Sequence, residues 1–217
     1  MKDITIYGAG GFGRETALLI QQINATTPSW NILGFFDDGL PKGDSIDGLK
    51  IQGGIAEALE YTGAMVIAVA DPVTREKMVT QLERTSIDFP TLVHPSAQLG
   101  SRDFNKLDRG CIITAGVVLT THITLGKFCI INLTSTIGHD VSIGPYTTIM
   151  PGCSISGNVT IGEGCLFGTG SRTLQNISIG HHATVGAGAV VTKDIEAGKT
   201  VVGVPARPKS QILNLEP

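Results

Sequence analysis

The sequence predicts a small α/β domain at the N-terminus followed by a parallel β-helix, and three patterns support this. From Leu107 to Val191 an aliphatic residue recurs every six positions. Neither an α-helix nor a flat strand produces that period, whereas a hexapeptide solenoid does. Before residue 90 the chain instead alternates strand-like and helix-like segments, and a glycine-rich loop follows the first strand-like segment.

The first predicted domain spans residues 1–90 and is expected to form a small, Rossmann-like parallel sheet with helices on its faces. Asp71 and Pro72 are suited to the N-cap and first position of its last helix. The predicted elements, in order, are a strand at 4–7, a glycine loop at 8–13, a helix at 16–23, a strand at 32–36, a helix at 55–61, a strand at 65–70 and a helix at 73–84.

The second predicted domain spans residues 91–217 and carries the hexapeptide repeat. Fourteen of the fifteen register positions from Leu107 to Val191 are apolar, and the exception is Thr173. Three hexads make one triangular coil of a β-helix, so residues 18 apart should stack. At roughly 4.8 Å between stacked strands, about five to six coils form a prism on the order of 25 Å long. The segment 101–106 interrupts the pattern before the strict register starts.

Composition excludes several classes of function. The net charge of −3 shows no basic excess, so nucleic-acid binding is not expected. The longest apolar run, Ala64–Ala70, has seven residues and is too short to span a membrane. Since no secretory signal is recognisable at the N-terminus, a cytoplasmic protein is expected. All four cysteines stand two positions before a register residue, which predicts inward-facing, unreactive thiols: Cys111, Cys129, Cys153 and Cys165.

The glycine loop is a candidate phosphate-binding site. Gly10, Gly11 and Gly13 lie between a predicted strand and a helix, and the next strand ends at Asp37-Asp38. Glycines let the backbone approach a diphosphate, and a helix N-terminus favours negative charge. A tight turn without a ligand is the simplest alternative. A nicotinamide dinucleotide is disfavoured because the domain is short, so a nucleotide diphosphate is expected.

His139 and Asp140 are the candidate proton-transfer pair. His139 occupies the third position of a hexad, near a corner of the prism and away from the aliphatic column. Imidazole accepts protons near neutral pH, and a neighbouring carboxylate can orient it. A solvated corner histidine is the alternative. The histidine spacings do not match a three-histidine zinc site, so no metal is expected.

Several motifs together resemble a known family, the bacterial acetyltransferases that modify nucleotide-linked sugars. These motifs are Gly8–Gly13, Phe36–Asp38, Ile137–Gly144, Gly157–Gly162 and Val202–Ala206. The group includes N-acetyltransferases of nucleotide-linked 4-amino-6-deoxy sugars and relatives of the sialic-acid O-acetyltransferase type. The resemblance covers nearly the whole chain and implies a left-handed β-helix that assembles as a homotrimer, with active sites between adjacent prisms.

The resemblance also implies roles for individual residues. His139 would be the general base with Asp140 beside it, and the Gly157 amide would hold the thioester carbonyl. Acetyl-CoA would lie along a groove past Thr169 and Ala187 toward Val204-Pro205. The nucleotide would bind at Gly10, Gly11, Gly13, Asp37 and Asp38, and Asn132 and Thr148 would lie near the sugar.

The function implied is acetyl transfer from acetyl-CoA to the amine of a nucleotide-linked amino-deoxy sugar, without a metal. The sequence departs from the family where some members carry a second histidine, because Thr148 stands there. It departs again at Ala70-Asp71, where members often carry Gly-Asn. Two alternatives remain open, namely O-acetylation of a sialic-acid-type sugar and a non-catalytic scaffold that binds nucleotide sugars.

Overall fold

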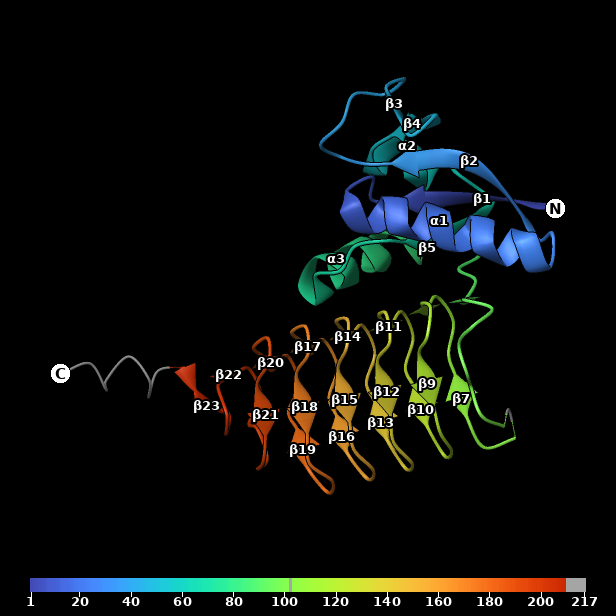
Figure 1. The fold of residues 1–217 in the computed structure, drawn as a ribbon. Coiled ribbons are helices and arrows are strands. Elements are labelled where there is room, and N and C mark those ends of the chain that lie inside the picture. Colours follow the sequence, from blue (N-terminus) through green and yellow to red (C-terminus); the bar gives the residue numbers. More distant parts are fainter. Residues whose placement is uncertain (102, 210–217) are drawn as a thin grey trace. The chain divides into compact units, whose positions relative to one another are not determined.

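The computed structural model describes residues 1–101 and 103–209, which form two compact units divided after Pro95. The last eight residues of the second predicted domain (91–217) lie outside the described residues. The predicted fold class is confirmed: the first unit is a parallel α/β layer structure, and the second is a parallel β-helix (Figure 1). Among the described residues, no helix has the length and apolar character needed to cross a membrane.

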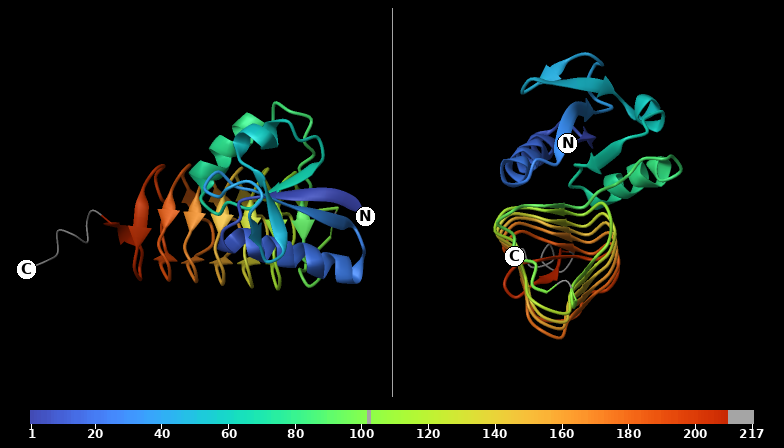
Figure 2. Two further views of the ribbon diagram at one scale, coloured as in Figure 1. Left: turned by 90° about the horizontal axis from the view of Figure 1, so that it is seen from above. Right: turned by 90° about the vertical axis from the view of Figure 1, so that its right-hand side faces the viewer.

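The first unit has a sheet in the order β3-β4-β2-β1-β5, with α1 on one face and α2 and α3 on the other (Figure 2). Asp71 caps α3 as predicted, because its carboxylate accepts a hydrogen bond from the Thr74 N–H at 2.8 Å. The elements are β1 (Lys2–Tyr7), α1 (Gly11–Thr26), β2 (Trp30–Phe36), β3 (Ser45–Ile46), β4 (Leu49–Gly53), α2 (Ile55–Leu59), β5 (Ala64–Ile67), α3 (Pro72–Leu82) and β6 (Leu92–Val93).

The hairpin β3–β4 is absent from the elements predicted from the sequence. Its turn residues Asp47 and Gly48 both have positive φ, 49° and 81°, and Ile46 pairs with Leu49 across the turn. An Asp-Gly pair between alternating apolar residues is a strong signal for a two-residue hairpin. The short strands and the surrounding glycines and aspartates obscure that signal. β4 then pairs in parallel with β2 and extends the sheet.

The second unit is a triangular prism whose strands stack at the expected spacing of 18 residues, for example Leu125 on Ile143 and Ile143 on Ile161 (Figures 1 and 2). One face holds β7 (Lys106–Leu107), β10 (Thr124–Leu125), β13 (Ser142–Ile143), β16 (Thr160–Ile161) and β19 (Ser178–Ile179). The second holds β8 (Ile112–Ile113), β11 (Ile130–Ile131), β14 (Thr148–Ile149), β17 (Leu166–Phe167), β20 (Thr184–Val185) and β22 (Thr200–Val202), with β23 (Arg207–Pro208) antiparallel to β22. The third holds β9 (Val118–Leu119), β12 (Thr136–Ile137), β15 (Ser154–Ile155), β18 (Arg172–Thr173) and β21 (Val190–Val191).

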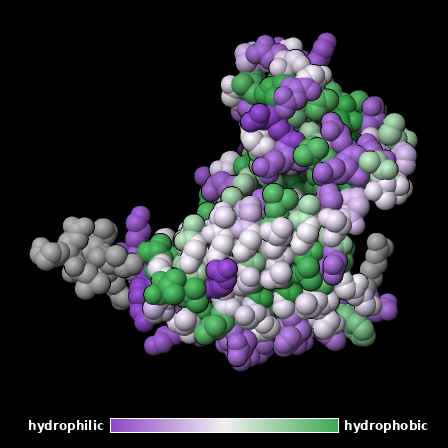
Figure 3. Space-filling view, viewed as in Figure 1, coloured by the Kyte–Doolittle hydropathy of each residue, from purple (hydrophilic) through white to green (hydrophobic). Residues whose placement is uncertain are grey.

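The inside of the prism is filled by the register column and the column two residues before it. Thr173, the polar exception, is buried, and its hydroxyl accepts a hydrogen bond from the Ser156 N–H at 3.2 Å. All four cysteines are buried and unbridged, as predicted. Outward positions are often serine or threonine, and the visible side of the solenoid is accordingly of intermediate hydropathy (Figure 3).

Candidate functional site

His139 and Asp140 occupy one corner of the prism, between β12 and β13. The His139 Nδ1 lies 2.8 Å from Asp140 Oδ2, and both side chains are exposed, at 64% and 55%. Asp140 has a φ of 59°, a left-handed conformation that aspartate tolerates better than most residues. With Nδ1–H donating to the carboxylate, the neutral ring keeps the lone pair of Nε2 for an incoming proton.

Gly157 lies one coil further along the same corner. The neighbouring Asn158 N–H donates to the His139 carbonyl at 2.8 Å, which fixes the two coils relative to each other. A Cβ built at Gly157 would overlap the His139 ring at Nε2, so only glycine lets the imidazole lie there. The Gly157 N–H has no hydrogen-bond partner among residues 1–101 and 103–209. The structure therefore brings an imidazole, a carboxylate and an amide donor without a partner among the described residues together.

This corner is called the His139 edge below, and it comprises residues 121–122, 139–140, 157–158 and 175–176. A second corner, the Asn132 edge, comprises residues 114–116, 132–134, 150–152, 168–170 and 186–188. It connects the second face to the third, whereas the His139 edge connects the third face to the first. The width of the third face therefore separates the two edges within one chain.

The Asn132 edge carries three of the predicted site residues. Asn132 is buried, and its Oδ1 accepts the Leu133 N–H at 2.7 Å, which leaves its Nδ2 as a donor without a partner among the described residues. Thr169 and Ala187 are one coil apart, and the Thr169 carbonyl accepts the Gly188 N–H at 2.9 Å. Thr148 lies within β14 and is buried.

Val204 and Pro205 follow β22 and are joined by a cis peptide bond. The segment that contains them folds against β21: the Val190 N–H donates to the Gly203 carbonyl at 3.1 Å, and the Ala206 N–H donates to the Val190 carbonyl at 2.8 Å. Val204 is highly exposed. These residues therefore extend the line of Thr169 and Ala187 toward the C-terminal end of the prism.

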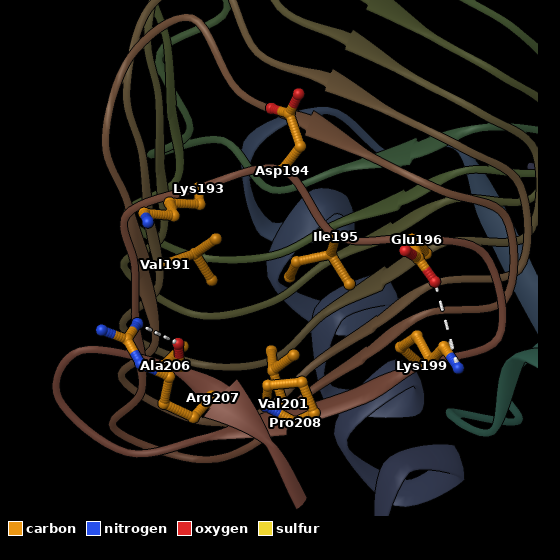
Figure 4. A pocket seen from close by; sticks show the side chains of 10 residues that line it. All are labelled: Val191, Lys193, Asp194, Ile195, Glu196, Lys199, Val201, Ala206, Arg207 and Pro208. Atoms are coloured by element: carbon orange, nitrogen blue, oxygen red, sulfur yellow. Dashed lines mark hydrogen bonds and ion pairs between the residues drawn. The ribbon is translucent and has the colours of Figure 1, made fainter. Parts of the chain in front are cut away.

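A cavity of about 480 Å³ lies at that end (Figure 4). Val191, Ile195 and Val201 point into it from the last coil, and Lys193 and Arg207 stand at its margin. None of the residues predicted for catalysis or substrate binding lines it. Its apolar walls are the end of the prism core, so this cavity is no candidate for the transfer site.

In the first unit, a separate cavity of about 540 Å³ opens beside the glycine loop. Gly10 and Asp37 line it, and the Asp37 carboxylate accepts the N–H groups of Ala9 at 2.8 Å and Gly39 at 2.9 Å. Gly11 has open space around it, while a Cβ at Gly13 would overlap the Gly8 carbonyl. Gly13 thus permits close packing of α1 on β1, and Gly10 and Gly11 leave room for a ligand.

Asp38 is placed differently from Asp37. Its Oδ2 accepts the Tyr7 hydroxyl at 2.7 Å, and its Oδ1 accepts the Ile55 N–H at 2.8 Å, so it does not line the cavity beside the glycine loop. Burial, and then the hydrogen bond to Asp38, raises the pKa of Tyr7 far above its usual value. Asp38 therefore holds β1 and α2 in place next to the loop.

Arg14 is absent from the site residues predicted from the sequence. It stands in the first turn of α1 and lines the cavity beside the glycine loop, where a guanidinium can pair with a phosphate. The signal for it was the basic residue directly after Gly13. Among the described residues, no group of three or more His, Cys, Asp and Glu side chains is placed to hold a metal ion.

Comparisons with known proteins agree with this architecture. The model of the PglD N-terminal domain matches residues 3–82, the six-repeat bacterial transferase hexapeptide model matches 140–175, and the hexapeptide repeat of succinyl-transferase matches 158–193. The chain is 33% identical to WeeI from Acinetobacter baumannii AYE, with a TM-score of 0.86, covering 96% of this chain and 100% of that one.

Two further relatives are named for acetyltransferase activity. The acetyltransferase domain of PglB from Neisseria gonorrhoeae FA1090, solved with acetyl coenzyme A, is 29% identical with a TM-score of 0.85, covering 95% of this chain and 98% of that one. The GDP-perosamine N-acetyltransferase of Escherichia coli O157:H7 is 33% identical over 150 residues, which span 68% of this chain and 66% of that protein, just under two thirds of its length. The chain belongs to the bacterial nucleotide-sugar acetyltransferase family, in which a PglD-type domain precedes hexapeptide repeats.

Proposed function

We propose that this chain transfers an acetyl group from acetyl-CoA to the amine of a nucleotide-linked amino-deoxy sugar. The observation that carries the proposal is the contact between the His139 ring and Gly157, which sets a proton acceptor beside an unpartnered amide donor. The relatives support the two substrates, since one was solved with acetyl coenzyme A and another is named for GDP-perosamine N-acetylation.

The proposed reaction is direct transfer. The sugar amine attacks the thioester carbonyl while His139 Nε2 takes its proton, and the Gly157 N–H donates to the oxygen that becomes negative. An amide donor of this kind contributes about 3 kcal/mol to stabilising the transition state. Asp140 stabilises the imidazolium, which then protonates the departing thiolate of CoA. The products are the N-acetyl sugar and CoA with a free thiol.

A covalent acetyl-cysteine intermediate is disfavoured. All four cysteines are buried, and their Sγ atoms lie near backbone carbonyls inside the prism, for example Cys153 to Gly168 O at 3.2 Å. Burial raises the pKa of the Cys153 and Cys165 thiols, which lowers the fraction of reactive thiolate at neutral pH. The amine therefore attacks acetyl-CoA without an acyl-enzyme.

We assign the nucleotide to the first unit. Gly10, Gly11 and Arg14 would receive the diphosphate, and Asp37 would accept a hydrogen bond from the nucleoside, while Gly13 and Asp38 hold the loop and the strand end in shape. A diphosphate is the chemistry that best fits open glycine backbone next to an arginine at a helix N-terminus.

The placement of the remaining residues supports a homotrimer with active sites between adjacent prisms. His139 and Gly157 lie on one edge of the prism, whereas Asn132, Thr169 and Ala187 lie on another. One chain does not bring these two sets together, but a three-fold arrangement of prisms can set the His139 edge of one subunit against the Asn132 edge of the next. Acetyl-CoA would run past Thr169 and Ala187 toward Val204-Pro205, with Asn132 and Thr148 on the sugar side.

The test is a thiol-release assay with acetyl-CoA against a panel of GDP-, UDP- and dTDP-linked amino-deoxy sugars and free sialic acid. The account predicts thiol release with at least one nucleotide-linked amine, and a product that carries an N-acetyl group by NMR. Thiol release with sialic acid but with none of the amines would instead show that the protein O-acetylates a sugar. Binding of a nucleotide sugar without release from any acceptor would replace the proposal by a scaffold function.

A further inference from the structure

An exposed aromatic pair stands at the N-terminal end of the His139 edge. The rings of Phe104 and His122 are stacked, with centroids 4.7 Å apart and planes inclined by 27°. Phe104 is 52% exposed although it is a large apolar side chain. Phe104, His122 and Asp140 follow one another at intervals of 18 residues, so the pair continues the line of the proposed catalytic corner.

The ring of His122 is held in a defined orientation next to that corner. Its Nδ1 lies 3.0 Å from the Thr121 hydroxyl, and the Thr121 carbonyl accepts the Asp140 N–H at 3.1 Å. When the threonine hydroxyl donates to Nδ1, the neutral ring carries its proton on Nε2. That Nε2 has no partner among the residues that the structure describes, so it is available as a donor.

We infer that Phe104 and His122 bind the hexose ring of the acceptor and contribute to sugar specificity. This inference rests on the proposed function. In the proposed function the Gly157 amide holds the thioester carbonyl one coil to the C-terminal side of His139, which leaves the N-terminal side, where this pair lies, for the acceptor. An exposed aromatic face packs against the C–H face of a sugar, and the His122 Nε2–H can donate to a sugar hydroxyl.

A purely structural role is the competing explanation. Phe104 precedes the strict repeat, and its stacking on His122 would hold this part of the chain against the first regular coils. The two explanations differ in what they predict for kinetics. A structural role would change folding, or KM for both substrates together. A binding role changes KM for the acceptor alone.

The test uses Phe104→Ala and His122→Asn, assayed with the best amino-sugar nucleotide of the panel above. Asparagine suits position 122 because φ there is 56°, a conformation that asparagine tolerates. We expect each variant to raise KM for the acceptor about tenfold, with KM for acetyl-CoA and the thermal midpoint unchanged. Phe104→Trp should restore the KM for the acceptor. The matched control is Val73→Ala, which shortens an exposed apolar side chain on α3.

Each result decides the question. An unchanged acceptor KM in both variants, with an active parent enzyme, would overturn this inference and leave the proposed function intact. A parallel rise of both KM values, or a lowered thermal midpoint that Phe104→Trp does not rescue, would assign the stack a structural role. An inactive parent enzyme across the panel would remove the proposed function, and the inference with it.

Discussion

Replacing His139 by alanine is expected to lower kcat for acetyl transfer about 10³-fold, because the amine then loses its proton acceptor during attack. The side chain is 64% exposed and contributes little to packing, so the variant should fold and assemble like the parent. The measurement is thiol release under saturating acetyl-CoA, together with circular dichroism and light scattering. Folding and mass should not change.

His181→Ala is the matched control for this experiment. His181 occupies the same position of its hexad as His139 and is also exposed, but it lies on the third edge of the prism, between β19 and β20. Its Nδ1 accepts the Glu163 N–H, at 3.2 Å. This control should retain near-parental kcat. A His139→Ala enzyme with near-parental turnover would contradict the assignment of the base.

Replacing Gly157 by alanine should lower kcat about 10²-fold, because the new methyl group would occupy the space of the His139 ring. The backbone at Gly157 does not have positive φ, so alanine fits there without backbone strain. The imidazole would have to turn away, which separates Nε2 from the amide that receives the oxyanion. Turnover and the thermal midpoint are measured together, and only turnover should change.

A double-mutant cycle separates this effect from a general disturbance of the corner. In a His139→Ala background the methyl group has no ring to displace, so Gly157→Ala should add little further loss, as expected for two directly coupled residues. If Gly157→Ala instead lowered kcat by the same factor in both backgrounds, the glycine would act independently of the histidine. That outcome would refute the proposed contact.

Much of the second unit follows from its repeat alone. Once residues 18 apart stack, the sequence places His139 next to Gly157, and the structure shows the two residues in contact. The same repeat indicates that Thr173 faces the interior, although its hydrogen bond to Ser156 cannot be inferred from the period. Regular repeats are predictable because each coil contacts only its neighbours.

The first unit is less predictable, because its site depends on side-chain direction. Asp37 and Asp38 are adjacent and chemically identical, and both lie in the loop after β2, so no regular alternation predicts where either side chain points. Asp37 lines the cavity at the glycine loop, while Asp38 turns to Tyr7 and Ile55. The Asp47-Gly48 hairpin is difficult to predict for another reason, because other loop-forming residues beside it mask its turn signal.

We propose that each active site combines the His139 edge of one subunit with the Asn132 edge of another. Subunit complementation tests it most directly, by co-expressing His139→Ala with Ala187→Trp, which blocks the proposed path of CoA. Each variant alone should be inactive, whereas random mixing of equal amounts should restore about a quarter of all sites, or one site in each mixed trimer, because an intact His139 there meets an intact groove. Recovery of that activity is the predicted result, and assembled mixed trimers without activity would contradict the claim.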